Sequence, residues 1–284
     1  MAEIVTGKTI PSGSAFYYIV GTLIVILTAA IAFGGIKKVS RWTDMMVPVM
    51  AVLYMVVVLL LIILNFTRIP YFFGSVFAGA FKPDAFFGGV FGTVLAQGVK
   101  RGLMSNEAGQ GTITMSAAAA DAKHPCEQGV IASLGVFLDT IVICTMTGHS
   151  IVLTGAWQVE GLEGVQVTTY AFQHGLPIPG QISAFVLMIC LVFFAFTTIL
   201  GWDYYSERCL EYLTNGHKKT ILTYRWLYIL AVFIGPYMTV SAVWTIADIF
   251  NGLMAIPNMI ALFALSGVIV KETKAFFAAE KHKM

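Results

Sequence analysis

Long apolar stretches with few charged residues dominate this chain of 284 residues. About 20 mostly apolar residues suffice for a helix to cross the hydrocarbon core of a bilayer, and we find about seven such stretches. They cover residues 14–33, 45–66, 85–119, 129–154, 181–200, 224–243 and 246–270. Because 58% of the residues are hydrophobic and 11% are charged, a soluble domain could not cover its surface with polar groups. The sequence therefore predicts an all-α polytopic protein embedded in the lipid bilayer.

Basic residues gather on one predicted side of the membrane. Most of the 17 lysines and arginines lie in or near the loops after the first, third and fifth stretches and in the tail 271–284. Cytoplasmic loops carry such an excess, so we expect a multi-pass protein of the cytoplasmic membrane with a cytoplasmic C-terminus and an external N-terminus. The opening "MAEIVTGKTIPSGSAF" lacks the basic and apolar regions of a signal peptide. We expect the chain to lack an upstream part.

The loops are too short to hide a second domain. The longest, residues 67–84 and 155–180, cannot form cores of their own, and a single transmembrane domain over residues 1–284 is predicted. The first of these loops is apolar and aromatic, which favours an interfacial or re-entrant helix on the external side.

Standard motifs for catalysis and cofactor binding do not occur in this sequence. GxSxG, HExxH and GxxxxGK[ST] are absent, and the four cysteines are scattered without metal-ligand spacing. We expect no enzyme activity, no cofactor and no nucleic-acid partner. An intramembrane hydrolase is disfavoured because Ser105 lacks a helix-spaced histidine base, and a retinal-type receptor because the last helix has no mid-membrane lysine. A passive channel remains an alternative.

The third stretch is interrupted by "RGLMSNEAGQGTITMSAAAA", residues 101–120. Its glycines each weaken helix propagation by about 1 kcal/mol relative to alanine, close to where Lys100, Arg101, Asn106 and Glu107 would otherwise stand in hydrocarbon. A broken helix is therefore predicted, and irregular backbone at membrane depth is tolerated where it lines a cavity. The exposed helix ends suit a carboxylate together with an ammonium group or a cation. Alternatively, the segment lies at the cytoplasmic mouth, with Glu107 as an N-cap or a partner of Arg101.

Asp139 is the most isolated acidic residue within a predicted span. A charge at that depth costs at least about 2.5 kcal/mol and commonly marks an ion or substrate path. Asp139 is therefore either a contributor to a cation site or a structural partner of Arg101 or Lys100. Asp248 and Asn251 are expected to tie the last helix to its neighbours. A solvated helix face near the cytoplasm is expected for Asp203, Glu207 and Arg208.

Several blocks of the chain resemble the alanine or glycine:cation symporter family, sodium-coupled amino acid carriers of bacteria and archaea. They are "GVKRGLMSNEAGQG" with the following alanine run, "HP" and "LGVFLDTIVICT"; "FAFTTILGWDYYSERCLEYL", residues 194–213; and "ADIFNGLMAIPNMIALFALSGVIVKETK", residues 247–274. The blocks keep the family's order, and the resemblance runs through nearly the whole chain.

The resemblance implies a leucine-transporter-like fold of two inverted five-helix repeats, here partial. Residues 14–66 would be the last two helices of the first repeat and residues 67–270 the second repeat. Residues 1–13 would start in an external loop and residues 271–284 would form the cytoplasmic tail. The family's "GTGN" motif on the first core helix has no counterpart here, so a missing N-terminal half is expected as a partner of this chain.

The resemblance also implies which residues meet the ligands. Substrate contacts are expected from Ser105, Asn106, Glu107, Gly109, Thr198 and Trp202, and sodium oxygens from Thr197 and Thr198, to which we add Asp139. Trp202 would cap a pocket that leaves room for alanine or glycine. Apart from the resemblance, the threonines would more simply bond to carbonyls of their own helix and Trp202 would sit at the membrane interface. The expected function is sodium-coupled alanine or glycine symport by alternating access, or else a truncated fragment that does not transport.

Overall fold

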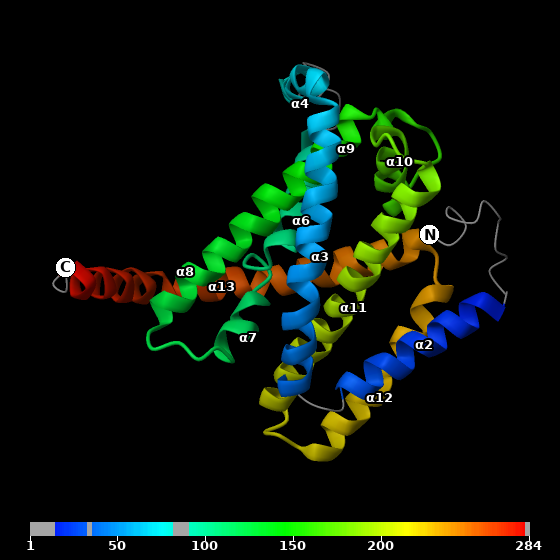
Figure 1. The fold of residues 1–284 in the computed structure, drawn as a ribbon. Coiled ribbons are helices and arrows are strands. Elements are labelled where there is room, and N and C mark those ends of the chain that lie inside the picture. Colours follow the sequence, from blue (N-terminus) through cyan, green and yellow to red (C-terminus); the bar gives the residue numbers. More distant parts are fainter. Residues whose placement is uncertain (1–14, 33–35, 82–90, 282–284) are drawn as a thin grey trace. The chain divides into compact units, whose positions relative to one another are not determined.

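The computed structural model describes residues 15–32, 36–81 and 91–281 as helices and connecting turns (Figure 1). No β-strand occurs among these residues. Four helices there are long and apolar enough to cross a membrane: Arg41–Leu64, Pro125–Leu153, Gly180–Leu213 and Val240–Ala279. The predicted class, an all-α polytopic membrane protein, is confirmed, while the count of about seven spans stays a prediction.

The chain divides into two compact units, each of which combines segments far apart in sequence. The first holds α2 (Ala15–Ala32), α3 (Ile36–Leu64), η1 (Phe66–Arg68), α4 (Ile69–Phe81), α9 (Cys144–Leu153), η3 (Ala156–Gln158), α10 (Val165–Gly175), α11 (Gly180–Leu213), α12 (Lys218–Ile234) and η4 (Gly235–Tyr237). The second holds α6 (Phe91–Asn106), α7 (Ile113–Ala118), α8 (Pro125–Val136), the π-helical η2 (Phe137–Ile143) and α13 (Val240–Lys281).

Helix α11 is the centre of the first unit and packs against α2, α3, α10 and α12 (Figure 1). Its buried side chains include Leu187 and Leu200, both fully inaccessible. Leu200 forms an apolar cluster with Ile31 of α2 and Val39 of α3. Apolar residues therefore hold α11 in place, and the polar groups that it carries sit on a fixed helix.

A close approach joins α3 to the end of α10. A Cβ atom on Gly175 would lie 2.8 Å from Leu61 Cγ and 2.9 Å from Thr154 Cγ2. Asn65 Nδ2 donates to the carbonyl oxygens of Leu61 and Gly175, at 2.9 Å each. Because only glycine leaves room for this contact, the side-chain amide of Asn65 can join the two helix ends.

Buried charges connect α11 to α12, contrary to the solvated face expected for this region. Asp203 and Glu207 are 4% and 6% exposed. Arg225 of α12 donates to both oxygens of Glu207, with Nε–Oε2 2.6 Å and Nη2–Oε1 2.8 Å, and Arg208 Nη2 adds a bond of 2.9 Å. The expectation was wrong for Asp203 and Glu207, because helix spacing cannot reveal that α12 covers this face of α11, whereas the side chain of Arg208 is 40% exposed.

Two predicted boundaries also differ from the structure. Residues 224–243 are not one helix, because α12 ends at Ile234 and a short turn containing Pro236 precedes α13; proline has no N–H with which to continue a helix. The loop 155–180 contains α10, which was not predicted. The apolar loop 67–84 does contain a helix, α4, as expected.

Candidate functional site

The interruption of the third apolar stretch lies between α6 and α7 in the second unit. Helix α6 ends at Asn106, α7 begins at Ile113, and the residues between them form turns. Glu107 and Gly111 have positive φ angles of 56° and 83°, a conformation that is costly for a side chain such as that of Glu107. The predicted broken helix is therefore present, with a strained residue at its start.

Asn258 of α13 holds this break in shape. Its Nδ2 donates to the carbonyl oxygens of Ala108 (2.8 Å) and Gly109 (2.9 Å). A Cβ atom on Gly111 would lie 2.7 Å from Asn258 Oδ1, so the glycine permits the approach. Asn106 Oδ1 accepts from Gly109 N at 3.0 Å. Asn258 was not predicted from the sequence, although a polar residue beside Pro257 in an apolar helix is a signal that could have found it.

Glu107 accepts a hydrogen bond within the break and is neither an N-cap nor the partner of Arg101. Its Oε2 accepts from Thr112 Oγ1 at 3.1 Å, and Thr112 is 1% exposed. Arg101 instead pairs with Asp248 of α13 at 3.3 Å, and its guanidinium lies 4.2 Å from the ring centre of Trp244. This geometry contradicts both structural alternatives that we considered for Glu107.

Asp248 also pairs with Lys100, at 3.3 Å, and so ties α13 to α6 as expected. Asp139 is not the partner of either cation. Ser105 Oγ donates to Asp139 Oδ2 at 2.8 Å and lies 3.1 Å from Thr140 Oγ1. The structure thus brings together one predicted substrate residue and one predicted sodium residue.

The backbone around Asp139 is π-helical over Phe137–Ile143. Such single-turn π segments within α-helices often mark functional sites. This one places Asp139 and Thr140 beside Ser105. The resulting group of a carboxylate and two hydroxyls offers oxygen atoms, which a hard cation or an ammonium group prefers.

Gln110 is the most deeply buried side chain of the break after Thr112, at 4% exposed. Its Oε1 is buried and has no hydrogen-bond donor among the described residues. An unpaired buried acceptor costs about 1 to 3 kcal/mol, so it requires an explanation. Gln110 was not predicted from the sequence, because a glutamine between two glycines carries no signal of burial.

The remaining predicted residues lie on α11, in the first unit. Thr197 Oγ1 donates to the carbonyls of Phe193 (2.9 Å) and Phe194 (3.1 Å), and Thr198 Oγ1 donates to Phe194 O at 2.7 Å. Both hydroxyls thus bond to carbonyls of their own helix, as expected for these threonines apart from the resemblance, and their role as sodium ligands stays a prediction. Trp202 follows Thr198 by one turn, and its ring lies 6.1 Å from that of Tyr205.

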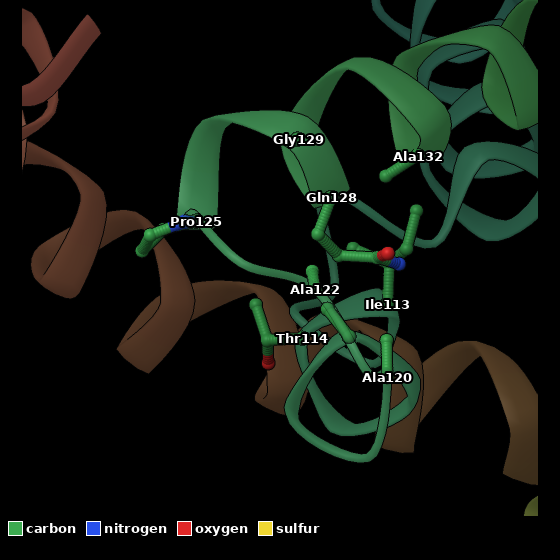
Figure 2. Close-up of a pocket in the computed structure, with 9 residues that line it drawn as sticks. Ile113, Thr114, Ala120, Ala122, Pro125, Gln128, Gly129 and Ala132 are labelled. Atoms are coloured by element: carbon green, nitrogen blue, oxygen red, sulfur yellow. The ribbon is translucent and has the colours of Figure 1, made fainter. Parts of the chain in front are cut away.

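A pocket of about 410 Å³ lies beside the break, between α7 and the start of α8 (Figure 2). Figure 2 shows Gln128 of α8 reaching toward Ile113 of α7. Alanines supply much of its wall: Ala117, Ala120, Ala122 and Ala132. None of the predicted ligand residues lines it, and its apolar wall offers little to a zwitterion, so the break itself is the better candidate site.

Comparison with known proteins agrees with the resemblance seen in the sequence. The model of the sodium:alanine symporter family matches residues 3–284. The sodium/alanine symporter of Methanococcus maripaludis is 44% identical over 268 residues, which are 93% of this chain and 58% of that protein. An uncharacterised transporter of Haemophilus influenzae is 44% identical over 259 residues, 90% of this chain and 56% of that protein.

A third relative carries a different substrate in its name. The probable sodium/glutamine symporter of Bacillus subtilis is 36% identical over 261 residues, 92% of this chain and 54% of that protein. The chain thus spans a little over half the length of these relatives. Since the family model covers nearly every residue, this multi-pass membrane chain belongs to the sodium:alanine symporter family, a family of transporters rather than enzymes.

Proposed function

We propose that this chain is part of a sodium-coupled carrier of a small neutral amino acid, alanine or glycine, in the cytoplasmic membrane. Downhill entry of Na⁺ would draw the amino acid inward by alternating access. Family membership supports the coupling to sodium, and the name of the archaeal relative supports alanine as substrate. The C-terminus would be cytoplasmic and the N-terminus external, as the distribution of basic residues indicates.

The observation that carries this proposal is the break between α6 and α7. Asn258 fixes its backbone by two hydrogen bonds, and Ser105 with Asp139 supplies oxygen atoms from the same unit. Discontinuous helices with such polar groups are the usual substrate and ion sites of secondary transporters. A break held by a specific side chain is better explained by a site than by disorder of the helix.

The roles of individual residues are part of the proposal. Ser105, Asn106, Glu107 and Gly109 would contact the amino acid, together with two residues of α11, Thr198 and Trp202. Thr197, Thr198 and Asp139 would provide oxygens to Na⁺. The bulky indole of Trp202 at the pocket would favour alanine and glycine over amino acids with larger side chains. Glutamine, which is named for the third relative, is one of these larger amino acids.

Sodium-driven uptake of labelled alanine into proteoliposomes tests the proposal. Because the chain spans a little over half of its relatives, one arm contains the chain alone and a second contains it co-expressed with the first half of the archaeal symporter. We expect uptake that needs an inward Na⁺ gradient, is inhibited by glycine and shows counterflow, which a channel would not.

The two arms separate the remaining alternatives. Uptake in the second arm only would agree with a chain that does not transport by itself. Uptake without Na⁺ would contradict the coupling, and alanine flux without counterflow would indicate a channel. Failure in both arms, with the chain shown to be folded by circular dichroism, would refute the proposed function.

A further inference from the structure

Gln110 stands apart from the other polar groups of the break because its Oε1 has no donor within the part of the chain that the structure describes. Ala108 O and Gly109 O accept from Asn258. Glu107 O accepts from Gly111 N at 2.9 Å. These three backbone carbonyls therefore accept hydrogen bonds from residues of the same unit. Gln110 Oε1 is buried and has no such bond from any described residue.

The break and the end of α6 carry acidic side chains. Glu107 lies within the same turn, and Asp139 accepts from Ser105 at the end of α6. The two cations on α6, Lys100 and Arg101, are both held by Asp248. A positively charged donor is therefore the ligand group that this part of the unit would favour.

We propose that Gln110 Oε1 accepts an N–H hydrogen bond from the ammonium group of the transported amino acid. The inference rests on the proposed function and adds to it a residue that binds the ammonium group of the substrate. The neutral carboxamide oxygen and the charged ammonium group would form a charge-assisted hydrogen bond, which is roughly twice as strong as a hydrogen bond between two neutral groups. Because the carboxamide of Gln110 is neutral, it adds no charge to the break when no substrate is bound.

An ammonium group fits better than Na⁺ at this oxygen. A hard cation takes several oxygen ligands at once, whereas the carbonyls of Ala108 and Gly109 are already engaged by Asn258. An ammonium group has three N–H donors and can give one of them to a single acceptor. A single carboxamide oxygen can therefore accept one N–H of an ammonium group, but it cannot by itself supply the several oxygen ligands that Na⁺ needs.

This role has a consequence for stability that a structural role lacks. Without ligand, the buried Oε1 destabilises the protein, because desolvation is not compensated by a hydrogen bond. Gln110→Met keeps a similar length and removes the acceptor, so the ligand-free variant should melt no lower than the unchanged chain. The same variant should lose affinity for alanine by about ten- to a hundredfold.

The experiment measures binding of labelled alanine at saturating Na⁺ and, separately, the Na⁺ concentration for half-maximal binding. Both arms of the transport assay are used, and melting of the ligand-free protein is recorded. Gln110→Glu retains an oxygen acceptor and should keep measurable affinity. Gln158→Met, at an exposed glutamine of η3, is the matched control and should change neither value.

Four results would overturn the inference. Gln110→Met could bind alanine as well as the unchanged chain, or it could shift only the Na⁺ requirement, which would assign the oxygen to the cation. A clearly lowered melting temperature of Gln110→Met without ligand would make Gln110 a structural residue. Absence of alanine binding by the unchanged chain in both arms would refute the proposed function as well.

Discussion

Removal of the side-chain amide of Asn258 should collapse the break between α6 and α7. Asn258→Leu keeps the approximate size of the residue and deletes the Nδ2 donor that bonds Ala108 O and Gly109 O at 2.8 and 2.9 Å. Each side-chain hydrogen bond contributes about 0.5 to 1.5 kcal/mol. We therefore expect the free energy of unfolding of Asn258→Leu to be lower than that of the unchanged chain by about 1 to 3 kcal/mol.

The loss should be visible in function as well as in stability. A break that is no longer fixed presents its acceptors in several geometries, so alanine affinity should fall by about five- to a hundredfold, at roughly tenfold for each 1.4 kcal/mol. Thermal melting in detergent and equilibrium binding of labelled alanine measure the two effects. Asn251→Leu, two turns earlier on α13, is the matched control, because Asn251 makes no side-chain hydrogen bond among the described residues, contrary to the expectation that it ties α13 to a neighbour.

An Asn258→Leu variant that melts and binds alanine like the unchanged chain would contradict this role of Asn258. The role would also be contradicted if Asn251→Leu had the same effect as Asn258→Leu, because the loss would then come from α13 in general and not from the two bonds. Asn258→Asp provides a further check: it replaces the donor by a charged acceptor facing two carbonyl oxygens, and it should be the more damaging substitution.

Four other changes test separate parts of the structure. Gly175→Ala places a Cβ atom 2.8 Å from a leucine side chain and should destabilise by about 1 to 3 kcal/mol; an unchanged melting curve would contradict the close approach. Arg225→Met leaves the buried Glu207 with Arg208 as its remaining cationic partner and should cost about 1.5 to 3 kcal/mol, most of which Glu207→Gln in the same chain should restore. Thr198→Ala should raise the Na⁺ concentration for half-maximal uptake, and an unchanged Na⁺ dependence would remove it from the cation site. Trp202→Ala should admit larger amino acids, whereas an unaltered substrate range would place the indole outside the pocket.

The break between α6 and α7 could be predicted because its cause is local. Glycines and polar residues in one short stretch weaken the helix wherever that stretch lies. What fixes the break could not be predicted in the same way, because Asn258 is 149 residues from Gly109 in sequence. Its identity depends on which face of α13 meets the turn.

Among the charged residues, too, some contacts could be predicted from the sequence and others could not. Asp248 was expected to tie α13 to a neighbour, and it pairs with Lys100 and Arg101. Asp203 and Glu207, by contrast, look like one solvated face from helix spacing alone, yet α12 covers them. Spacing along a helix reports which residues share a face, but not whether another helix packs on it.

The class of this protein, its long apolar helices, the break and the family could be predicted from the sequence, because they depend on composition, local propensity and short motifs. Tertiary structure decided which groups are paired: Ser105 with Asp139, Glu207 with Arg225, and Asn258 with the turn. It also left Gln110 Oε1 buried without a donor from residues 15–32, 36–81 or 91–281. Pairing of polar groups is set by contacts between helices distant in sequence, and a buried group without a partner can be recognised only when all its neighbours are in place.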